Sequence, residues 1–214
     1  MTLGTTTRAS VLAGAFLMGA SLVSGCTSTT GGTATPVASS PAASSAPTAD
    51  VPKVASPLDA SKYENDPCGL VPKDELSRLK YVDPGEPRLN DGSVENEAGP
   101  NCGWKIKGEG ISLLVTLATG NRDRGGGGLA GIQADYERPK GVTKFLERAP
   151  DVEGYPAIYW DTRDRRSSGN CSMAVGIADD LAVYVIAGGY EGQQDSCDAA
   201  QGAAAGIVRT LKGA

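Results

Sequence analysis

Cys26 carries the most specific chemistry in this sequence, because it ends the segment Leu22-Val23-Ser24-Gly25-Cys26. A bacterial lipoprotein signal peptide needs a thiol that can be alkylated, preceded by small residues that let a peptidase reach the backbone. The apolar run at residues 11–23 follows Arg8 and is too short to cross roughly 30 Å of hydrocarbon. We therefore predict cleavage before Cys26 and a lipid on its sulfur. The alternative is an ordinary signal peptide in which this cysteine is coincidental.

The remaining four cysteines form an even set: Cys68, Cys102, Cys171 and Cys197. In an oxidising compartment such a set indicates disulfides. The competing interpretation is a zinc site, but the spacings contain no C-x-x-C pair, which structural zinc sites usually have. We therefore expect two disulfides and no metal.

A predicted tight turn at Asp179-Asp180 helps to choose the disulfide partners. The turn places Cys171 opposite about Gly188, and only eight residues separate Gly188 from Cys197. A bond between Cys171 and Cys197 would therefore close easily. This favours the pairs Cys68–Cys102 and Cys171–Cys197, while the rival set, Cys68–Cys197 with Cys102–Cys171, stays open.

Arginines follow two of the predicted strands and are the candidate ligand-binding residues. Guanidinium groups suit carboxylates and phosphates, so an anionic ligand of the cell envelope would fit if the two strand ends converge. The alternative is that Asp123 and Asp164, which are interleaved with the arginines, neutralise them at a solvated surface. The candidates are Arg122, Arg124, Arg163, Arg165 and Arg166.

The sequence contains no histidine, which excludes Ser-His-Asp and Cys-His catalysis as well as His-ligated metals. The chain has 20 basic and 25 acidic residues, and removal of residues 1–25 takes away only Arg8 of these. The mature chain is therefore acidic, which disfavours nucleic acids and anionic lipid head groups as partners. We expect no cofactor and no catalytic residues.

Other motifs have simpler structural explanations. Residues 125–128 are four consecutive glycines between a strand and a helix, but no Lys-Ser/Thr follows, so a phosphate-binding turn is not indicated. Asp179-Asp180 suits a hairpin turn better than a calcium site. The aromatic side chains are expected in the core, although a small pocket between the sheet and the last helix remains possible. They are Trp104, Tyr136, Tyr155, Tyr159, Trp160, Tyr184 and Tyr190.

Three segments organise the chain. Residues 1–25 are the predicted signal peptide. Residues 26–57, after the lipidated cysteine, are rich in Ser, Thr, Ala and Pro, and we expect a disordered stalk. Residues 58–214 are long enough for one domain with a real core.

The domain is expected to be α+β, with a mainly antiparallel sheet of about five strands, helices at both ends and one helix between. Residues 111–119 are the clearest strand, because Ile111, Leu113, Val115 and Leu117 alternate with smaller or polar residues. The last helix is expected to be capped by Asp195 or Ser196. The predicted strands are 102–106, 111–119, 155–162, 171–178 and 181–188, and the predicted helices are 73–80, 129–137 and 195–211.

Several motifs together resemble the actinobacterial lipoproteins of domain-of-unknown-function family 3558. The resemblance implies an extracytoplasmic location and two disulfides, and it brings no functional residues because the family has no established activity. The motifs that carry it are Asp66-Pro67-Cys68-Gly69-Leu70-Val71, Cys102-Gly103-Trp104, Cys171 heading a strand, Cys197 opening an alanine-rich helix, Asn121-Arg122-Asp123-Arg124 and Glu153-Gly154-Tyr155-Pro156-Ala157.

The sequence therefore predicts a cell-surface lipoprotein held to the membrane through Cys26. Its domain is expected to be a non-enzymatic binding or accessory module whose partner is an anionic envelope ligand or another envelope protein. One alternative is an enzyme that works without histidine, through two carboxylates about 5–9 Å apart in a cleft. The other alternative is a structural envelope protein, which would expose an apolar patch.

Overall fold

The structure, a computed structural model, describes residues 51–90 and 96–213, all of which belong to one compact unit. Cys26, the predicted signal peptide and most of the predicted stalk lie outside the described residues. None of the helices in the described part of the chain has the length and apolar character that a membrane span requires.

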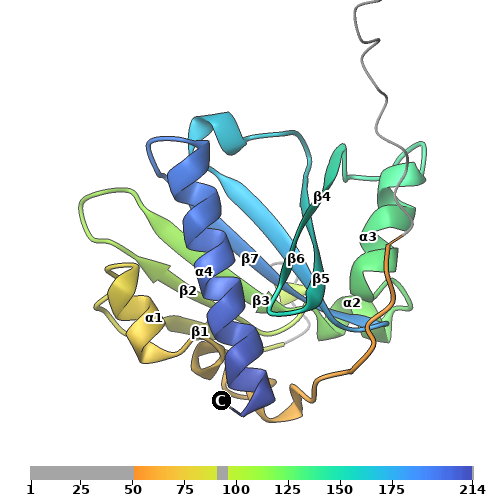
Figure 1. Cartoon of the computed structure of the whole chain (residues 1–214), viewed down its shortest axis with the longest axis horizontal. Helices are drawn as coiled ribbons and strands as arrows, with labels where there is room; N and C mark the ends of the chain where they lie inside the picture. Colours follow the sequence, from red (N-terminus) through yellow and green to blue (C-terminus); the bar gives the residue numbers. More distant parts are fainter. Residues whose placement is uncertain (1–50, 91–95, 214) are drawn as a thin grey trace, which may run out of the picture. The chain divides into compact units, whose positions relative to one another are not determined.

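A single antiparallel sheet of seven strands forms the centre of the domain, in the order β1-β2-β3-β7-β6-β5-β4 (Figure 1). This corrects the expected number of about five strands. The strands are β1 (Glu86–Arg88), β2 (Asn101–Lys105), β3 (Ser112–Leu117), β4 (Phe145–Val152), β5 (Tyr155–Asp161), β6 (Cys171–Ala178) and β7 (Leu181–Gly188).

The two unpredicted strands, β1 and β4, lie at the two edges of the sheet. All three residues of β1 are exposed, and only Ala149 and Val152 of β4 are buried. An edge strand with so little burial lacks the apolar alternation by which strands are recognised in a sequence. Both strands pair only with the strand that follows them in the chain, β1 with β2 and β4 with β5.

Short helices flank the sheet and one long helix closes the domain. The 3-10 turns are η1 (Ser61–Tyr63), η2 (Pro67–Leu70) and η4 (Arg166–Ser168), and the α-helices are α1 (Lys73–Arg78), α2 (Thr119–Asp123), α3 (Gly128–Glu137) and α4 (Gln193–Lys212). Helix α2 was not predicted. Helix α4 begins at Gln193 with Gly192 as its N-cap, so neither Asp195 nor Ser196 caps it.

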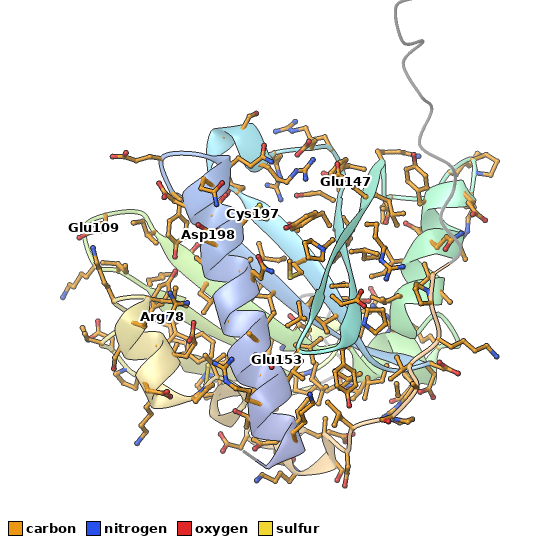
Figure 2. All side chains as sticks on the ribbon, in the orientation of Figure 1. Arg78, Glu109, Glu147, Glu153, Cys197 and Asp198 are labelled. Atoms are coloured by element: carbon orange, nitrogen blue, oxygen red, sulfur yellow. A yellow bond between two sulfur atoms is a disulfide. The ribbon has the colours of Figure 1, made fainter. Side chains whose placement is uncertain are left out.

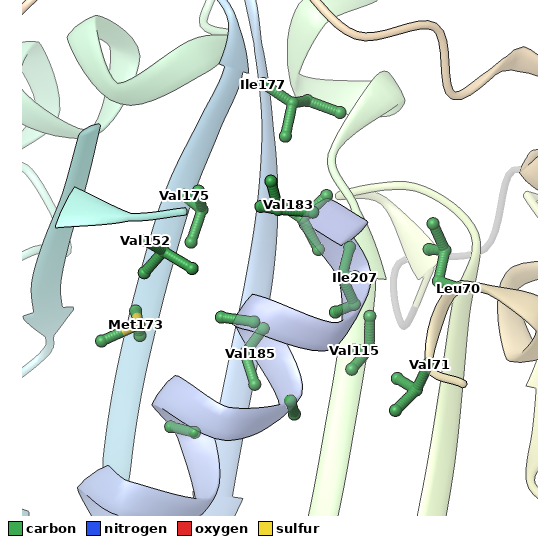
Figure 3. Close-up of a cluster of buried hydrophobic side chains, with 14 of the residues drawn as sticks. Leu70, Val71, Val115, Val152, Met173, Val175, Ile177, Val183, Val185 and Ile207 are labelled. Atoms are coloured by element: carbon green, nitrogen blue, oxygen red, sulfur yellow. The ribbon is translucent and has the colours of Figure 1, made fainter. Parts of the chain in front are cut away.

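Helix α4 covers one face of the sheet, which we call the first face (Figure 1). Its small residues allow close approach: Ala200 and Ala203 are completely buried, and they belong to the same core cluster as Val115, Met173 and Val185 (Figure 3). Core side chains therefore fill the space between the sheet and this helix, where the sequence had left a small pocket possible. Helix α1 packs on α4 beside two glycines, Gly202 and Gly206.

The disulfides link peripheral elements to the sheet. Cys68 in η2 is bonded to Cys102 in β2, and Cys171 at the start of β6 is bonded to Cys197 in the first turns of α4 (Figure 2). These are the pairs that the predicted hairpin favoured, and in the structure Cys171 lies opposite Ala187, one residue from the expected Gly188. The second bond holds the N-terminal part of α4 against the sheet.

The folded domain begins before Leu58, where the sequence placed its start. The Val54 backbone N–H donates to the Asp179 carboxylate over 2.9 Å, and its side chain is buried in the core. The Tyr155 hydroxyl donates to the carbonyl oxygen of Ser56. Residues 51–57, which were assigned to the stalk, are therefore bound to the domain by backbone hydrogen bonds and by burial of a valine.

Candidate functional site

The predicted arginine surface does not form, because strand direction separates its two halves. Strand β3 is antiparallel to β7, β7 to β6 and β6 to β5, so β3 and β5 run in opposite directions. Arg122 and Arg124 follow β3, whereas Arg163, Arg165 and Arg166 follow β5. The two groups consequently lie at opposite ends of the sheet, and the five guanidiniums cannot surround one ligand.

The two arginines after β3 are engaged with neighbouring residues. Arg122 forms ion pairs with Asp123 at 3.1 Å and with Glu64 at 3.5 Å. Arg124 donates to the Glu97 carbonyl oxygen and to the Asn121 side-chain oxygen, each over 2.8 Å. Arg124 therefore attaches the loop that precedes β2 to helix α2.

Within residues 51–90 and 96–213, two of the three arginines after β5 are paired as well. Arg165 contacts Asp161 at 2.7 Å, and Arg166 lies 2.9 Å from both Glu147 and Asp164. The side-chain hydrogen bonds from Arg166 lower the pKa of Asp164, and the same bonds, together with those to Glu147, raise the pKa of Arg166. Arg163 is exposed. The alternative in which interleaved acids neutralise the arginines is therefore the better description of this loop.

A different cleft lies on the second face of the sheet, opposite α4. Register places Arg88 of β1, Asn101 of β2, Thr116 of β3 and Tyr184 of β7 in one row across four strands. Directly paired residues project from the same face of an antiparallel sheet. The row runs from an exposed arginine at the edge to a buried tyrosine near the centre, and all four residues line the cleft.

A second row supplies the apolar part of the cleft floor. Leu114 of β3 pairs with Ile186 of β7, and both side chains are only half-buried. Trp160 of β5 also lines the cleft, and its ring centroid lies 5.0 Å from that of Tyr184. The floor is therefore formed by two aliphatic side chains and an aromatic pair.

Helix α3 and nearby loops form the walls. Helix α3 packs Leu129 and Ile132 against Ala118, Ala174 and Ala182, which covers only part of the second face. The space that remains has a volume of about 630 Å³, within the range of small-molecule sites. The wall residues that line it are Glu97, Ala98, Gly99, Asn121, Arg124, Gly126, Gly131, Ile132, Asp135, Arg138, Val142 and Thr143.

Tyr184 is held rigidly in the floor. Its hydroxyl accepts a 2.8 Å hydrogen bond from the Asn121 side-chain amide, and burial raises the pKa of this tyrosine. The Trp160 indole Nε1–H is buried without a hydrogen-bond partner among the described residues. Tyr184 is thus neutral and fixed in orientation, and Trp160 packs against it, which suits the pair to packing against a ligand.

The charges of the cleft lie on its walls and, at Arg88, on the edge strand β1. Its lining includes three arginines and two carboxylates, so positive charge exceeds negative charge locally in an otherwise acidic chain. Asp135 accepts a 2.8 Å hydrogen bond from the Thr143 backbone N–H, and this bond lowers the pKa of Asp135. Glu97 pairs with Arg124, and Arg138 lies 3.6 Å from Asp135.

The described residues contain no group of three or more metal-ligating side chains. Gly127 and Gly128 instead let the loop before α3 approach the β6–β7 turn. A Cβ at Gly127 would lie 2.0 Å from the Asp180 carbonyl oxygen, and one at Gly128 would lie 2.2 Å from that of Asp179. The glycine run therefore serves packing, and Asp179 binds the N-terminal segment through Val54.

A second hollow of about 730 Å³ lies between α1 and the loop before β1, with Leu76, Val82 and Trp104 in its lining. We favour the cleft on the second face because its floor is a rigid sheet on which apolar and polar groups converge. In the sequence, this cleft is indicated by apolar residues at both odd and even positions of β5 and β7, which give both faces of these strands apolar side chains. Trp160 and Ile186 belong to the face that α4 does not cover, and they were not predicted as site residues.

The comparison with protein families confirms the resemblance to the domain-of-unknown-function family. A family model described as a protein of unknown function (DUF3558) matches residues 21–210. No curated protein and no solved structure matches the chain. Because the match spans most of the sequence, including the whole sheet and both disulfides, this chain belongs to the DUF3558 family.

Proposed function

We propose that this chain is a lipid-anchored, non-enzymatic binding module on the outer side of the cytoplasmic membrane. The segment that ends in Cys26 supports the anchor, and the two disulfides fit an oxidising compartment. Two acyl chains on a cysteine would give stable membrane attachment where one would not. The residues between Cys26 and Val51 would connect the lipid anchor to the domain.

The observation that carries the binding function is the cleft on the second face. Leu114 and Ile186 remain partly exposed on its floor, although the rest of β3 and β7 is largely buried. Small-molecule sites combine such apolar surface with a few convergent polar groups. Here Trp160, Thr116 and Asn101 join the two aliphatic side chains around a volume of about 630 Å³.

The state of the carboxylates favours binding over catalysis. A general acid needs a raised pKa, because it must hold its proton near neutral pH. In the cleft, the Thr143 N–H lowers the pKa of Asp135, and Glu97 is paired with Arg124. Asp135 is therefore not prepared to donate a proton, Glu97 is engaged by Arg124, and the sequence contains no histidine that could replace them.

The proposal is tested by filling the cleft. The mature chain from residue 26, carrying Cys26→Ser so that no detergent is needed, is secreted into an oxidising compartment and immobilised. The immobilised protein is then incubated with an envelope extract from the cells in which it naturally occurs. After washing, the protein is eluted and native mass spectrometry shows whether a small molecule is bound. We expect a small molecule on the unmodified cleft and on Tyr136→Trp, a control on the exposed side of α3, but none on Leu114→Trp.

The same molecule on Leu114→Trp, or no molecule on any variant, would contradict the binding function. Circular dichroism of Leu114→Trp shows whether the domain remains folded. The anchor is tested separately on the full chain in its own cells. Intact-mass analysis should find a diacylglyceryl group on the wild-type protein and none on Cys26→Ser, and an unlipidated wild-type chain would overturn it.

A further inference from the structure

We infer that the cleft takes an amphiphile, with its apolar body on the floor and a single anionic group, carboxylate or phosphate, at Arg88. This inference rests on the proposed binding function and assigns its ligand class. Its basis is the spatial separation of two kinds of surface. Leu114, Trp160, Tyr184 and Ile186 lie on the inner strands of the sheet, whereas the three arginines of the lining lie on the edge strand β1 or on the walls.

The floor provides an apolar surface of limited length. Leu114 and Ile186 are neighbours across β3 and β7, and Ile132 of α3 also lines the cleft. Val142, whose exposed fraction is 71%, extends the apolar surface to the mouth of the cleft. A valine with so much exposed surface would gain from being covered by an apolar chain, because burial of apolar area is favourable.

The guanidinium groups of the three arginines differ in how many hydrogen bonds and ion pairs they already form with the protein. Arg124 donates to Glu97 and Asn121, so its guanidinium is committed to holding the wall. Arg138 lies near Asp135, which offsets part of its charge. Arg88 is exposed, and none of the carboxylates in residues 51–90 and 96–213 forms an ion pair with it.

Arg88 also lies at the end of the cleft where the head group of a ligand on the floor would be placed. It occupies the edge end of the row that continues through Asn101 and Thr116 to Tyr184. A ligand lying along this row would place one end on the aromatic pair and the other at the guanidinium. Because a guanidinium can donate two parallel hydrogen bonds, it suits the planar carboxylate and the phosphate equally.

Probes with one tail and different head groups test the inference. Decanoate, decyl phosphate, decanol, decyltrimethylammonium and inorganic phosphate are titrated calorimetrically into the mature Cys26→Ser chain, below their micelle-forming concentrations. We expect decanoate and decyl phosphate to bind about tenfold more tightly than decanol, as one charge-assisted hydrogen bond allows. Inorganic phosphate lacks the apolar tail and should show no measurable binding, and decyltrimethylammonium, whose charge has the same sign as the three arginines, should bind more weakly than decanol.

Variants assign the contacts. Arg88→Gln should bring the affinity for decanoate close to that for decanol and leave decanol unchanged, while Arg138→Gln should have a smaller effect. Arg122→Gln is the matched control, because Arg122 lies on α2 beside Arg124 but does not line the cleft. Leu114→Trp should abolish binding of every decyl probe.

Three results would overturn the amphiphile: decanol binding as tightly as decanoate, no binding of any decyl probe, or an anion preference that survives Arg88→Gln. The first and third leave the cleft as a binding site for another kind of ligand. Failure of the binding function itself is recognised separately, by an envelope molecule that remains on Leu114→Trp or is absent throughout. Tighter binding of decyl phosphate than of decanoate would identify lipid phosphates, rather than fatty acids, as the source of the anionic group.

Discussion

Arg166 and Glu147 form a two-point ion pair between the β5–β6 connection and the edge strand β4. Arg166 Nη1 lies 3.1 Å from Glu147 Oε1, and Nη2 lies 2.9 Å from Oε2. The guanidinium also stacks on Phe145 at 4.6 Å and on Tyr159 at 5.1 Å from the ring centroids. Glu147 is seen on β4 in Figure 2. An arginine that seemed available for a ligand is therefore part of the framework.

Replacement of Arg166 by lysine should lower the free energy of unfolding by about 1–2 kcal/mol, since lysine keeps the charge but loses the fork and the stacking. Arg163→Lys is the matched control on the same exposed loop, and its effect should stay within about 0.5 kcal/mol. Urea denaturation followed by circular dichroism measures both variants. Equal stabilities would show that the two-point contact contributes nothing.

Gly206 should be intolerant of a large side chain. A Cβ at this position would lie 3.0 Å from Pro72 Cδ and 3.2 Å from Glu75 Cγ, where α1 packs on α4. Gly206→Leu should therefore lower the free energy of unfolding by about 1–3 kcal/mol, more than the gain of about 0.8 kcal/mol in helix propensity. Gln201→Leu adds a leucine at a half-buried position of the same helix. Gln201→Leu should leave the free energy of unfolding, measured by thermal denaturation, nearly unchanged. A Gly206→Leu domain as stable as this control would refute the packing argument.

Tyr81 should make the domain sensitive to alkaline pH. Its hydroxyl lies 3.0 Å from that of Tyr190, and burial, followed by this hydrogen bond, raises the pKa of Tyr81 well above its usual value. The unfolded chain releases this proton near pH 10, while the folded chain retains it. The contribution of Tyr81 to the free energy of unfolding should therefore be constant below about pH 10 and fall as the pH rises further, by up to about 1.4 kcal/mol per pH unit.

The measurement for Tyr81 is urea denaturation at pH 8, 10 and 11. Tyr81→Phe should be less stable at pH 8, because Tyr190 loses its partner, and should show a shallower decline above pH 10. Tyr136→Phe, at an exposed tyrosine, should leave the decline unchanged. A decline that is equally steep in all three proteins would exclude Tyr81 as its source.

The central strands were predictable because their burial repeats along the chain. Residues 171–178 and 181–188 match β6 and β7 at both ends, and the turn between them follows from two aspartates. The predicted helix at 129–137 differs from α3 by one residue. Edge strands β1 and β4 were missed because most of their residues are at least partly exposed, so no alternation of apolar and polar residues marks them.

The sequence by itself determined the features that depend on local pattern or on counting. These are the alternating strands, the even set of four half-cystines, the family membership and the absence of histidine chemistry. The tertiary structure decided everything that depends on strand direction and on coverage of the sheet. Opposite directions of β3 and β5 divide the arginines, and the partial cover given by α3 leaves Leu114 and Ile186 at the floor of a cleft. Such long-range placement follows from pairing between distant segments, which no local pattern of residues encodes.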